Sequence, residues 1–96
     1  MGNLRKPTYP GEILNEEFLI PLNMTQRKLA DHIGCDVKVI NRIVNERSAI
    51  SAEMALKLGA SLKTSADFWM NAQKAVDLYE ARKVLRVLPK PIDKAG

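Results

Sequence analysis

The segment from Gln26 to Asn45 constrains the fold of this chain more than any other part of it. It holds two short amphipathic helical patterns with a glycine between them. Two helices that cross steeply after a tight turn need a small residue at the crossing, a turn residue that tolerates positive φ, and a small apolar plug at the corner. Ala30, Gly34 and Cys35 stand at these three positions. The segment therefore predicts a helix-turn-helix.

Helix signals before and after this segment predict a small all-α domain of five helices. Pro10 suits the first turn of a first helix, where its missing N–H costs little, and Pro21 ends that helix. Apolar residues recur at helical spacing in each helix, so each should bury one face. Four more helices begin after good N-cap residues, which are Thr25, Asp36, Ser51 and Ser65. The expected core residues are Ile13, Leu14, Phe18, Leu29, Ala30, Ile33, Cys35, Ile40, Ile43, Val44, Met54, Ala55, Leu58, Leu62, Phe68, Trp69, Ala72, Val76 and Tyr79.

The chain is long enough, at 96 residues, for one domain with a modest core. We expect residues 1–8 to form a flexible basic arm, residues 9–83 the helical domain, and residues 84–96 a C-terminal tail. The net charge of +4 permits nucleic-acid binding without establishing it. Basic residues are in excess in the arm, in residues 24–50 and in residues 80–96, whereas residues 9–23 hold three glutamates and no basic residue.

The sequence also predicts the compartment. Cys35 is the only cysteine, so an internal disulfide is impossible and a reducing compartment is expected. The N-terminus has no apolar core of the signal-peptide type, and no apolar run approaches the ~20 residues of a membrane span. We therefore expect a cytoplasmic protein with no membrane partner.

A helix-turn-helix suits DNA recognition, because its second helix enters the major groove with its N-terminal residues nearest the bases. Lys38 and Arg42 can donate to guanine O6 and N7, Asn41 can pair with adenine, and Val37 or Val39 can meet a thymine methyl. The residues expected to face outward are Val37, Lys38, Asn41, Arg42 and Asn45. Those better placed for phosphates are Gln26, Arg27, Lys28 and Arg47. The alternative is a plain helical hairpin whose charges form a solvated face.

Nothing in the residues indicates an enzyme, a cofactor or a metal site. His32 and Cys35 are the only histidine and cysteine, so a metal would have to take its other ligands from carboxylates. Glu16 and Glu17 are adjacent and diverge by roughly 100° on a helix, so they do not converge as an acid–base pair. We therefore expect a protein that is not an enzyme and binds neither cofactor nor metal.

A series of short motifs from residue 9 to residue 80 resembles a known family. In order, the motifs are YPGEIL (9–14), EEFL (16–19) with Pro21-Leu22, MTQ (24–26) with Leu29-Ala30, NRI (41–43) with Asn45, AIS (49–51), EMAL (53–56), Thr64-Ser65 and FWMNAQ (68–73). In these residues the chain resembles the HigA/VapI family of antitoxins, within the Cro/CI-like (XRE-type) class of helix-turn-helix proteins.

The resemblance implies a lambda-repressor-like fold and the function of a bacterial antitoxin. Such a protein binds operator DNA as a homodimer, represses its own operon, and neutralises a HigB-like toxin, a ribosome-dependent mRNA endonuclease. Carried over residue by residue, the DNA-facing positions are Gln26, Val37, Lys38, Asn41, Arg42 and Asn45. The chain departs from the pattern at Asp36, where Ser or Pro is commoner, and at Glu46, where glycine is usual. Both departures place negative charge beside the DNA backbone.

Several alternatives stay open. The chain could be a solitary phage-type repressor, or a protein-interaction module that does not bind DNA. The segment from Phe68 to Gln73, with Val76 and Tyr79, could be core or a dimer seam that sets two recognition helices about 34–36 Å apart. The tail from Arg82 alternates basic and apolar residues. It could be a frayed end, a membrane-surface helix, or a strand that binds a toxin or exchanges between subunits.

Overall fold

The computed structural model describes residues 5–93, so residues 1–4 of the expected arm and 94–96 of the expected tail lie outside it. The first helix consists of α1 (Pro10–Ile13) and η1 (Leu14–Leu19), a π-helical continuation of α1. It is followed by α2 (Gln26–Ile33), α3 (Val37–Val44), α4 (Ala52–Leu62) and α5 (Ala66–Val84). The described residues contain no strand, and the prediction of an all-α fold with five helices is confirmed.

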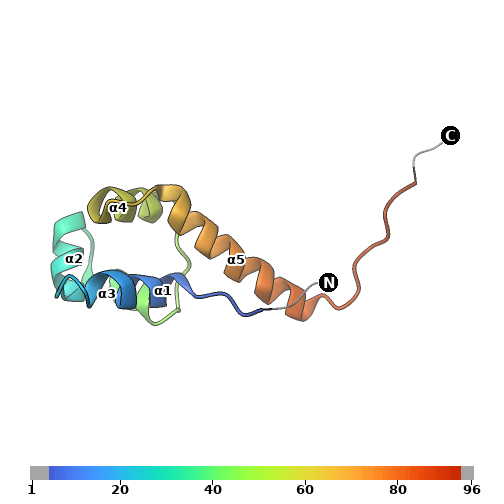
Figure 1. Cartoon of the computed structure of the whole chain (residues 1–96), viewed down its shortest axis with the longest axis horizontal. Helices are drawn as coiled ribbons and strands as arrows, with labels where there is room; N and C mark the ends of the chain where they lie inside the picture. Colours follow the sequence, from blue (N-terminus) through green and yellow to red (C-terminus); the bar gives the residue numbers. More distant parts are fainter. Residues whose placement is uncertain (1–4, 94–96) are drawn as a thin grey trace.

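Figure 1 shows how these helices are arranged. The first helix and α2, α3 and α4 form a compact head, and α5 begins beside α4 and then extends away from the head. The N-terminal segment runs back beside the far half of α5, and the residues after α5 continue outward. The molecule is therefore elongated, with principal extents of 59 × 24 × 20 Å. Only the head has the compact shape of a globular domain.

All four predicted N-caps are confirmed. Each cap side chain accepts a hydrogen bond from a backbone N–H in the first turn of its helix, which satisfies one of the donors that a helix start leaves unpaired. The cap residues are Thr25, Asp36, Ser51 and Ser65, which accept from Lys28, Lys38, Met54 and Phe68 at 3.0, 2.8, 3.1 and 3.0 Å. Pro10 occupies the first turn of α1, as expected.

Four helices end in the same backbone motif. In each, a residue with positive φ is followed by a residue whose N–H bonds the carbonyl five positions back, as in the Schellman motif. The residues with positive φ are Asn23, Gly34, Glu46 and Lys63, with φ of 55°, 78°, 62° and 61°. The bonds run from Met24, Cys35, Arg47 and Thr64 to Leu19, Ala30, Arg42 and Gly59 at 2.9, 2.9, 2.8 and 3.0 Å. This device allows short connections between steeply crossing helices.

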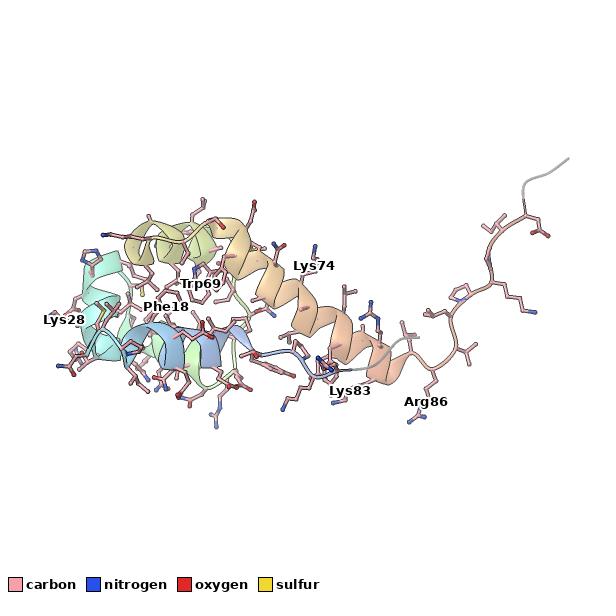
Figure 2. All side chains as sticks on the ribbon, viewed as in Figure 1. Phe18, Lys28, Trp69, Lys74, Lys83 and Arg86 are labelled. Carbon is pink, nitrogen blue, oxygen red and sulfur yellow. The ribbon has the colours of Figure 1, made fainter. Side chains whose placement is uncertain are left out.

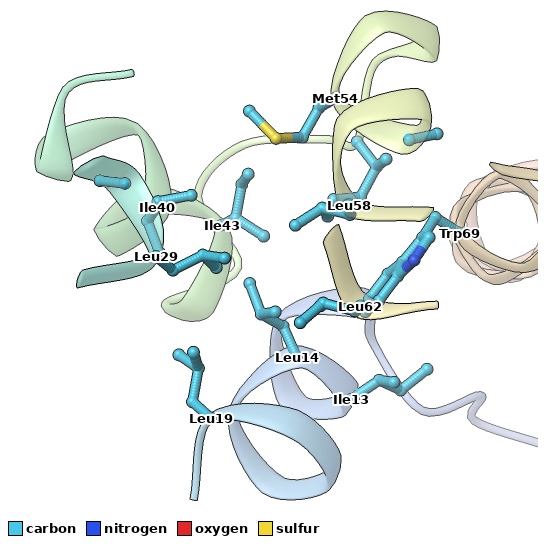
Figure 3. Packing of buried hydrophobic residues seen from close by; sticks show 13 residues of the cluster. Ile13, Leu14, Leu19, Leu29, Ile40, Ile43, Met54, Leu58, Leu62 and Trp69 are labelled. Carbon is cyan, nitrogen blue, oxygen red and sulfur yellow. The ribbon is translucent and has the colours of Figure 1, made fainter. Parts of the chain in front are cut away.

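The core lies where all five helices meet (Figure 3). The largest fully buried side chains are Trp69, Leu14, Leu29, Ile40 and Leu58. The buried indole N–H of Trp69 donates to Thr64 Oγ1 at 2.8 Å. Gly11 also belongs to this packing, because a Cβ at that position would overlap the carbonyl oxygen of Ile43. The start of α1 therefore touches the end of α3 backbone to backbone.

One expected core residue lies partly outside. Phe68 was expected to point inward, but its side chain is 38% exposed. Its ring instead packs edge-on against Trp69, with centroids 5.1 Å apart, and against Phe18, with centroids 6.4 Å apart. The reason is that Trp69, the next residue on α5, takes the inward position, and neighbouring helical residues diverge by roughly 100°.

The far half of α5 contacts the N-terminal segment rather than the core. Tyr9 Oη donates a hydrogen bond to Glu80, and Lys6 Nζ lies 5.5 Å from the centre of the Tyr9 ring. Lys83 pairs with Glu80 at 3.6 Å. After Val84 the described residues are exposed and not helical. In residues 5–93, no helix is long and apolar enough to cross a membrane.

Candidate nucleic-acid interface

The turn between α2 and α3 has the geometry that the sequence predicted. Ala30 is fully buried at the helix crossing, and Gly34 adopts φ 78° and ψ 41°. Cys35 is half-buried and packs against the core, and its burial raises the pKa of its thiol. The thiol therefore serves as a small apolar plug. Among the described residues, no group of three or more His, Cys, Asp and Glu could hold a metal ion.

The helix α3 has one buried face and one exposed polar face. Ile40 and Ile43 are buried, as predicted. The exposed residues on this helix are Lys38, Val39, Asn41 and Arg42, followed by Asn45 at its end. The polar face thus carries two cations and two amides that nothing in the head covers.

The orientation expected for Val37 is corrected by the structure. Val37 was expected to face outward, but it is half-buried and packs against the core. It shares a helix face with Ile40 and Val44, three and seven positions further along, and that face is the inward one. Val39, in contrast, is 38% exposed. Of the two valines, Val39 presents the larger apolar surface to solvent.

A hydrogen bond joins the start of α2 to the exposed face of α3. Asn41 Nδ2 donates to Gln26 Oε1 at 3.1 Å. This bond leaves the Gln26 side-chain NH₂ as a donor and the Asn41 side-chain oxygen as an acceptor. An adenine edge in the major groove offers the complementary pair, its N7 acceptor and N6 donor. Sequence reasoning named both residues but did not pair them.

Asn45 is held by the end of its own helix. Its Nδ2 donates to the backbone carbonyl of Asn41 at 2.9 Å, so the side chain caps α3. This bond uses one N–H of the side-chain amide and leaves its second N–H as a donor and its oxygen as an acceptor. Asn45 was predicted only as an outward-facing residue, and its capping bond was not predicted.

The basic residues of α2, α3 and the loop after α3 have no ionic partner among residues 5–93. The ion pairs in this range are Lys57–Glu53 on α4 and Lys83–Glu80 on α5. The exposed, uncompensated cations of the unit are Arg27, Lys28, Lys38, Arg42 and Arg47. Figure 2 shows Lys28 at the opposite end of the molecule from Lys83 and Arg86. The unit can therefore attract an anion.

Two acidic residues stand beside this positive surface. Asp36 uses Oδ1 to accept the Lys38 N–H, so part of its charge serves the helix start. Glu46 is exposed and lies directly after α3, at φ 62°. Glu46 therefore keeps its negative charge next to the exposed side chain of Arg47.

The structure also shows a residue that sequence reasoning missed. Gln73 on α5 accepts a hydrogen bond from the backbone N–H of Ile50 at 2.8 Å. Ile50 is a buried core residue in the connection between α3 and α4, and it was not in the expected core. The only signal in the sequence was the position of Gln73 at the end of the FWMNAQ motif. That motif carries no indication of a partner 23 residues away.

Comparisons with known proteins agree on one architecture. The helix-turn-helix family model matches residues 16–69. The antitoxin HigA-1 of Vibrio cholerae serotype O1 is 37% identical over 78 residues, which are 81% of this chain and 73% of that protein. The Pseudomonas aeruginosa antitoxin HigA, solved with the higBA promoter, has a TM-score of 0.80 and 40% identity over 82% of this chain and 86% of its own. The antitoxin GraA in complex with its operator has a TM-score of 0.84 and 34% identity over 97% and 99%.

Proposed function

The chain belongs to the helix-turn-helix family, in the group of the HigA antitoxins, and on that premise we propose that it is a DNA-binding antitoxin. It represses its own operon and neutralises a HigB-like toxin. One observation carries the proposal. The exposed face of α3 is polar, basic and joined to the start of α2 by the Gln26–Asn41 bond, in a fold shared with antitoxins solved on promoter and operator DNA. Because its ligand is DNA, we place the protein in the cytoplasm.

In this proposal α3 lies in the major groove and reads the bases. Lys38 and Arg42 donate to guanine, and the Gln26–Asn41 pair meets adenine through its donor and acceptor. Val39, and the part of Val37 that remains accessible, contact a thymine methyl. Contacts to phosphates fix the register of α3 along the groove and come from Arg27, Lys28, Asn45 and Arg47.

The decisive experiment removes the two cations of the reading face. We expect Lys38→Ala combined with Arg42→Ala to weaken binding to the DNA upstream of the gene by about 2 kcal/mol or more, about 30-fold. Both side chains are exposed, so the melting temperature should stay nearly unchanged. Binding would be measured by fluorescence anisotropy over a range of salt, where the intact protein should show a steep slope because phosphate contacts release counterions.

The control for this experiment removes the same charge elsewhere. Arg86→Ala combined with Lys90→Ala takes two cations from the exposed segment after α5. This variant should keep most of the affinity for specific DNA. Equal losses in the two double variants would mean that the DNA responds only to net charge, and the assignment of α3 as the reading helix would fail.

The protein acts as a homodimer in this proposal, with a seam on the outer face of α5. Five residues of α5 and Leu85, which directly follows the helix, have the alternating three- and four-residue spacing of a helix–helix seam: Phe68, Asn71, Ala75, Leu78, Arg82 and Leu85. All six are exposed in the single chain. Antiparallel pairing of two copies about the midpoint between 75 and 78 sets Phe68 opposite Leu85, Asn71 opposite Arg82, and Ala75 opposite Leu78. Each pairing is chemically compatible, and the small Ala75 accommodates Leu78.

Three outcomes distinguish this function from its alternatives. Co-purification of the chain with the product of the neighbouring reading frame, expressed together, supports the antitoxin. DNA binding without any captured toxin would favour a solitary repressor. Toxin capture by a chain that fails to bind any upstream DNA would favour a protein-interaction module.

A further inference from the structure

The connection between α3 and α4, residues 45–51, is called here the α3–α4 loop, and Gln73 on α5 holds it in place. Gln73 Oε1 accepts the Ile50 N–H at 2.8 Å, and Gln73 Nε2 donates to Asp77 Oδ1 at 2.9 Å. Ile50 is 3% exposed, and a backbone N–H at a buried residue needs a hydrogen-bond partner. The Gln73 side chain therefore supplies the bond that a buried backbone donor requires.

Asp77 determines which end of the Gln73 amide faces the loop. A carboxylate only accepts hydrogen bonds, so it takes an N–H of the amide and leaves the carbonyl oxygen for Ile50. An amide turned by 180° would set two acceptors against each other at Asp77 and two donors at Ile50. The two side chains thus form a directional contact from α5 to the α3–α4 loop, which we call the Gln73–Asp77 brace.

The α3–α4 loop is fixed at only a few points, and the brace acts at one of them. Its first part is fixed by the bond from the Arg47 N–H to the Arg42 carbonyl at 2.8 Å. Ser48 and Ala49 are exposed, and Ile50 is the next fixed point. A hollow of about 170 Å³ lies against the loop, lined by Glu46, Arg47, Ser48, Ala49, Gln73, Val76, Ile43, Tyr9, Pro10 and Gly11. At Ile50 the loop is held by core packing of the side chain and by the hydrogen bond that the backbone N–H donates to Gln73.

We propose that Gln73 is a positioning residue for DNA binding, which acts through Ile50 to hold Arg47 and Ser48 where they meet a DNA phosphate. The inference rests on the proposed DNA-binding function. Arg47 lies three residues after the end of α3 and three residues before Ile50, so the brace sets the reach of its cation relative to the reading helix. Without the brace, the loop would have more conformational freedom in the free protein. It would lose more conformational entropy when Arg47 contacts a phosphate, so DNA would bind more weakly.

The test is a double-mutant cycle between Gln73 and Arg47, measured with the duplex upstream of the gene at several salt concentrations. Arg47→Ala should weaken binding about tenfold and lower the magnitude of the salt slope by about 0.9. Gln73→Met leaves the net charge unchanged and should cause most of the same loss. Added to Gln73→Met, Arg47→Ala should cost less than about twofold more. Two independent, additive losses would overturn the proposal.

A charge-neutral rescue tests the direction of the brace. Gln73→Glu alone keeps an acceptor near Ile50 but sets a carboxylate against Asp77, so binding should weaken. Gln73→Glu together with Asp77→Asn restores a donor next to position 73 and the original net charge. This double variant should recover the affinity and the salt slope of the natural protein. A double variant as weak as Gln73→Glu alone would contradict the proposed geometry.

A matched variant separates positioning from simple loss of stability. Thr64→Val removes the acceptor of the buried Trp69 N–H, far from the α3–α4 loop, and should lower the melting temperature while leaving the salt slope and the effect of Arg47→Ala intact. The hydrogen-exchange rate of the Ile50 amide reports on the Gln73–Ile50 bond in the absence of DNA. It should be faster by on the order of tenfold in Gln73→Met and unchanged in Thr64→Val. Unchanged exchange in Gln73→Met refutes the brace, whereas faster exchange in a chain that binds no DNA refutes only the proposed function.

Discussion

At the scale of single residues, Glu46 is the position where local backbone and function conflict. It has φ 62°, and its N–H bonds the Ile43 carbonyl at 3.0 Å at the end of α3. The left-handed conformation costs a residue with a Cβ about 1–2 kcal/mol, whereas glycine adopts it freely. The family pattern usually has glycine at this position, and the positive φ of Glu46 gives a physical reason for that preference.

Glu46→Gly should therefore stabilise the fold by about 0.5–1 kcal/mol, because relief of the strain exceeds the entropy that glycine adds to the unfolded chain. Urea unfolding measures this difference. The same change removes a negative charge beside Arg47, so DNA should also bind more tightly. Lys63→Gly is the matched control, since Lys63 has φ 61° at the end of α4.

The control should gain stability without any gain in DNA affinity. If Glu46→Gly lost stability, the left-handed backbone would not be a source of strain in this protein. If it gained stability but left DNA binding unchanged, the Glu46 carboxylate would not face a phosphate.

At the scale of elements, the far half of α5 and the N-terminal segment stabilise each other. Beyond Val76 this helix leaves the core, and Tyr9, Glu80, Lys6 and Lys83 join the two segments. The hydrogen bond to Glu80 raises the pKa of Tyr9 to about 12, with desolvation and the charge of Glu80 adding to the shift. The same bond from Tyr9 lowers the pKa of Glu80. The contact therefore requires a protonated phenol and an ionised carboxylate.

The pH dependence follows from the signs of these shifts. The Tyr9 pKa is raised from 10.0, so its contribution is fully present below pH about 10 and is lost as the pH rises through about 12. The Glu80 pKa is lowered, so its contribution is lost as the pH falls through the folded-state value. Ultraviolet absorbance of tyrosinate should show a late titration that Tyr9→Phe abolishes.

Limited trypsin digestion after Arg5 measures how firmly the N-terminal segment is held; the Lys6–Pro7 bond resists trypsin. Tyr9→Phe should accelerate cleavage after Arg5, because the segment loses its hydrogen bond to α5. Glu80→Gln keeps a neutral acceptor and should have a smaller effect. Equal protection in all three proteins would show that the N-terminal segment is held by other contacts.

At the scale of the whole molecule, one chain presents one reading helix, and its long α5 extends away from the head. The proposed two-fold dimer would place two α3 helices on one face of DNA about 34–36 Å apart, so the proposed seam on α5 would control DNA affinity as well as assembly. Leu78 lies in the middle of that seam and is 45% exposed in the single chain. A charge at this position would have to be buried between two copies.

Leu78→Glu should convert the dimer to a monomer, as measured by analytical ultracentrifugation, and weaken binding to a two-fold symmetric DNA site. Leu56→Glu is the control, since Leu56 is 64% exposed on α4 and outside the seam. The control should stay dimeric and bind as before. A dimeric Leu78→Glu protein would place the subunit contact on another surface.

The sequence by itself determined the helices, their caps and the turn of the recognition unit. Each N-cap side chain bonds a backbone N–H two or three residues away: those of Thr25, Asp36, Ser51 and Ser65. Gly34 adopts the positive φ that its own turn requires. Such signals are local, because both partners of each interaction lie in one short stretch of chain. The family could be predicted for the same reason, since its motifs are made largely of these local signals.

Only the tertiary structure decided which distant residues meet. Gln26 bonds Asn41, Gln73 bonds Ile50, Tyr9 bonds Glu80, and Gly11 lies against the Ile43 carbonyl. It also turned Val37 inward and left Phe68 partly exposed, although both lie on helices that were placed correctly. Each of these outcomes depends on the angle and rotation of one helix against another. Those quantities come from packing the whole core at once, so no short stretch of sequence contains them.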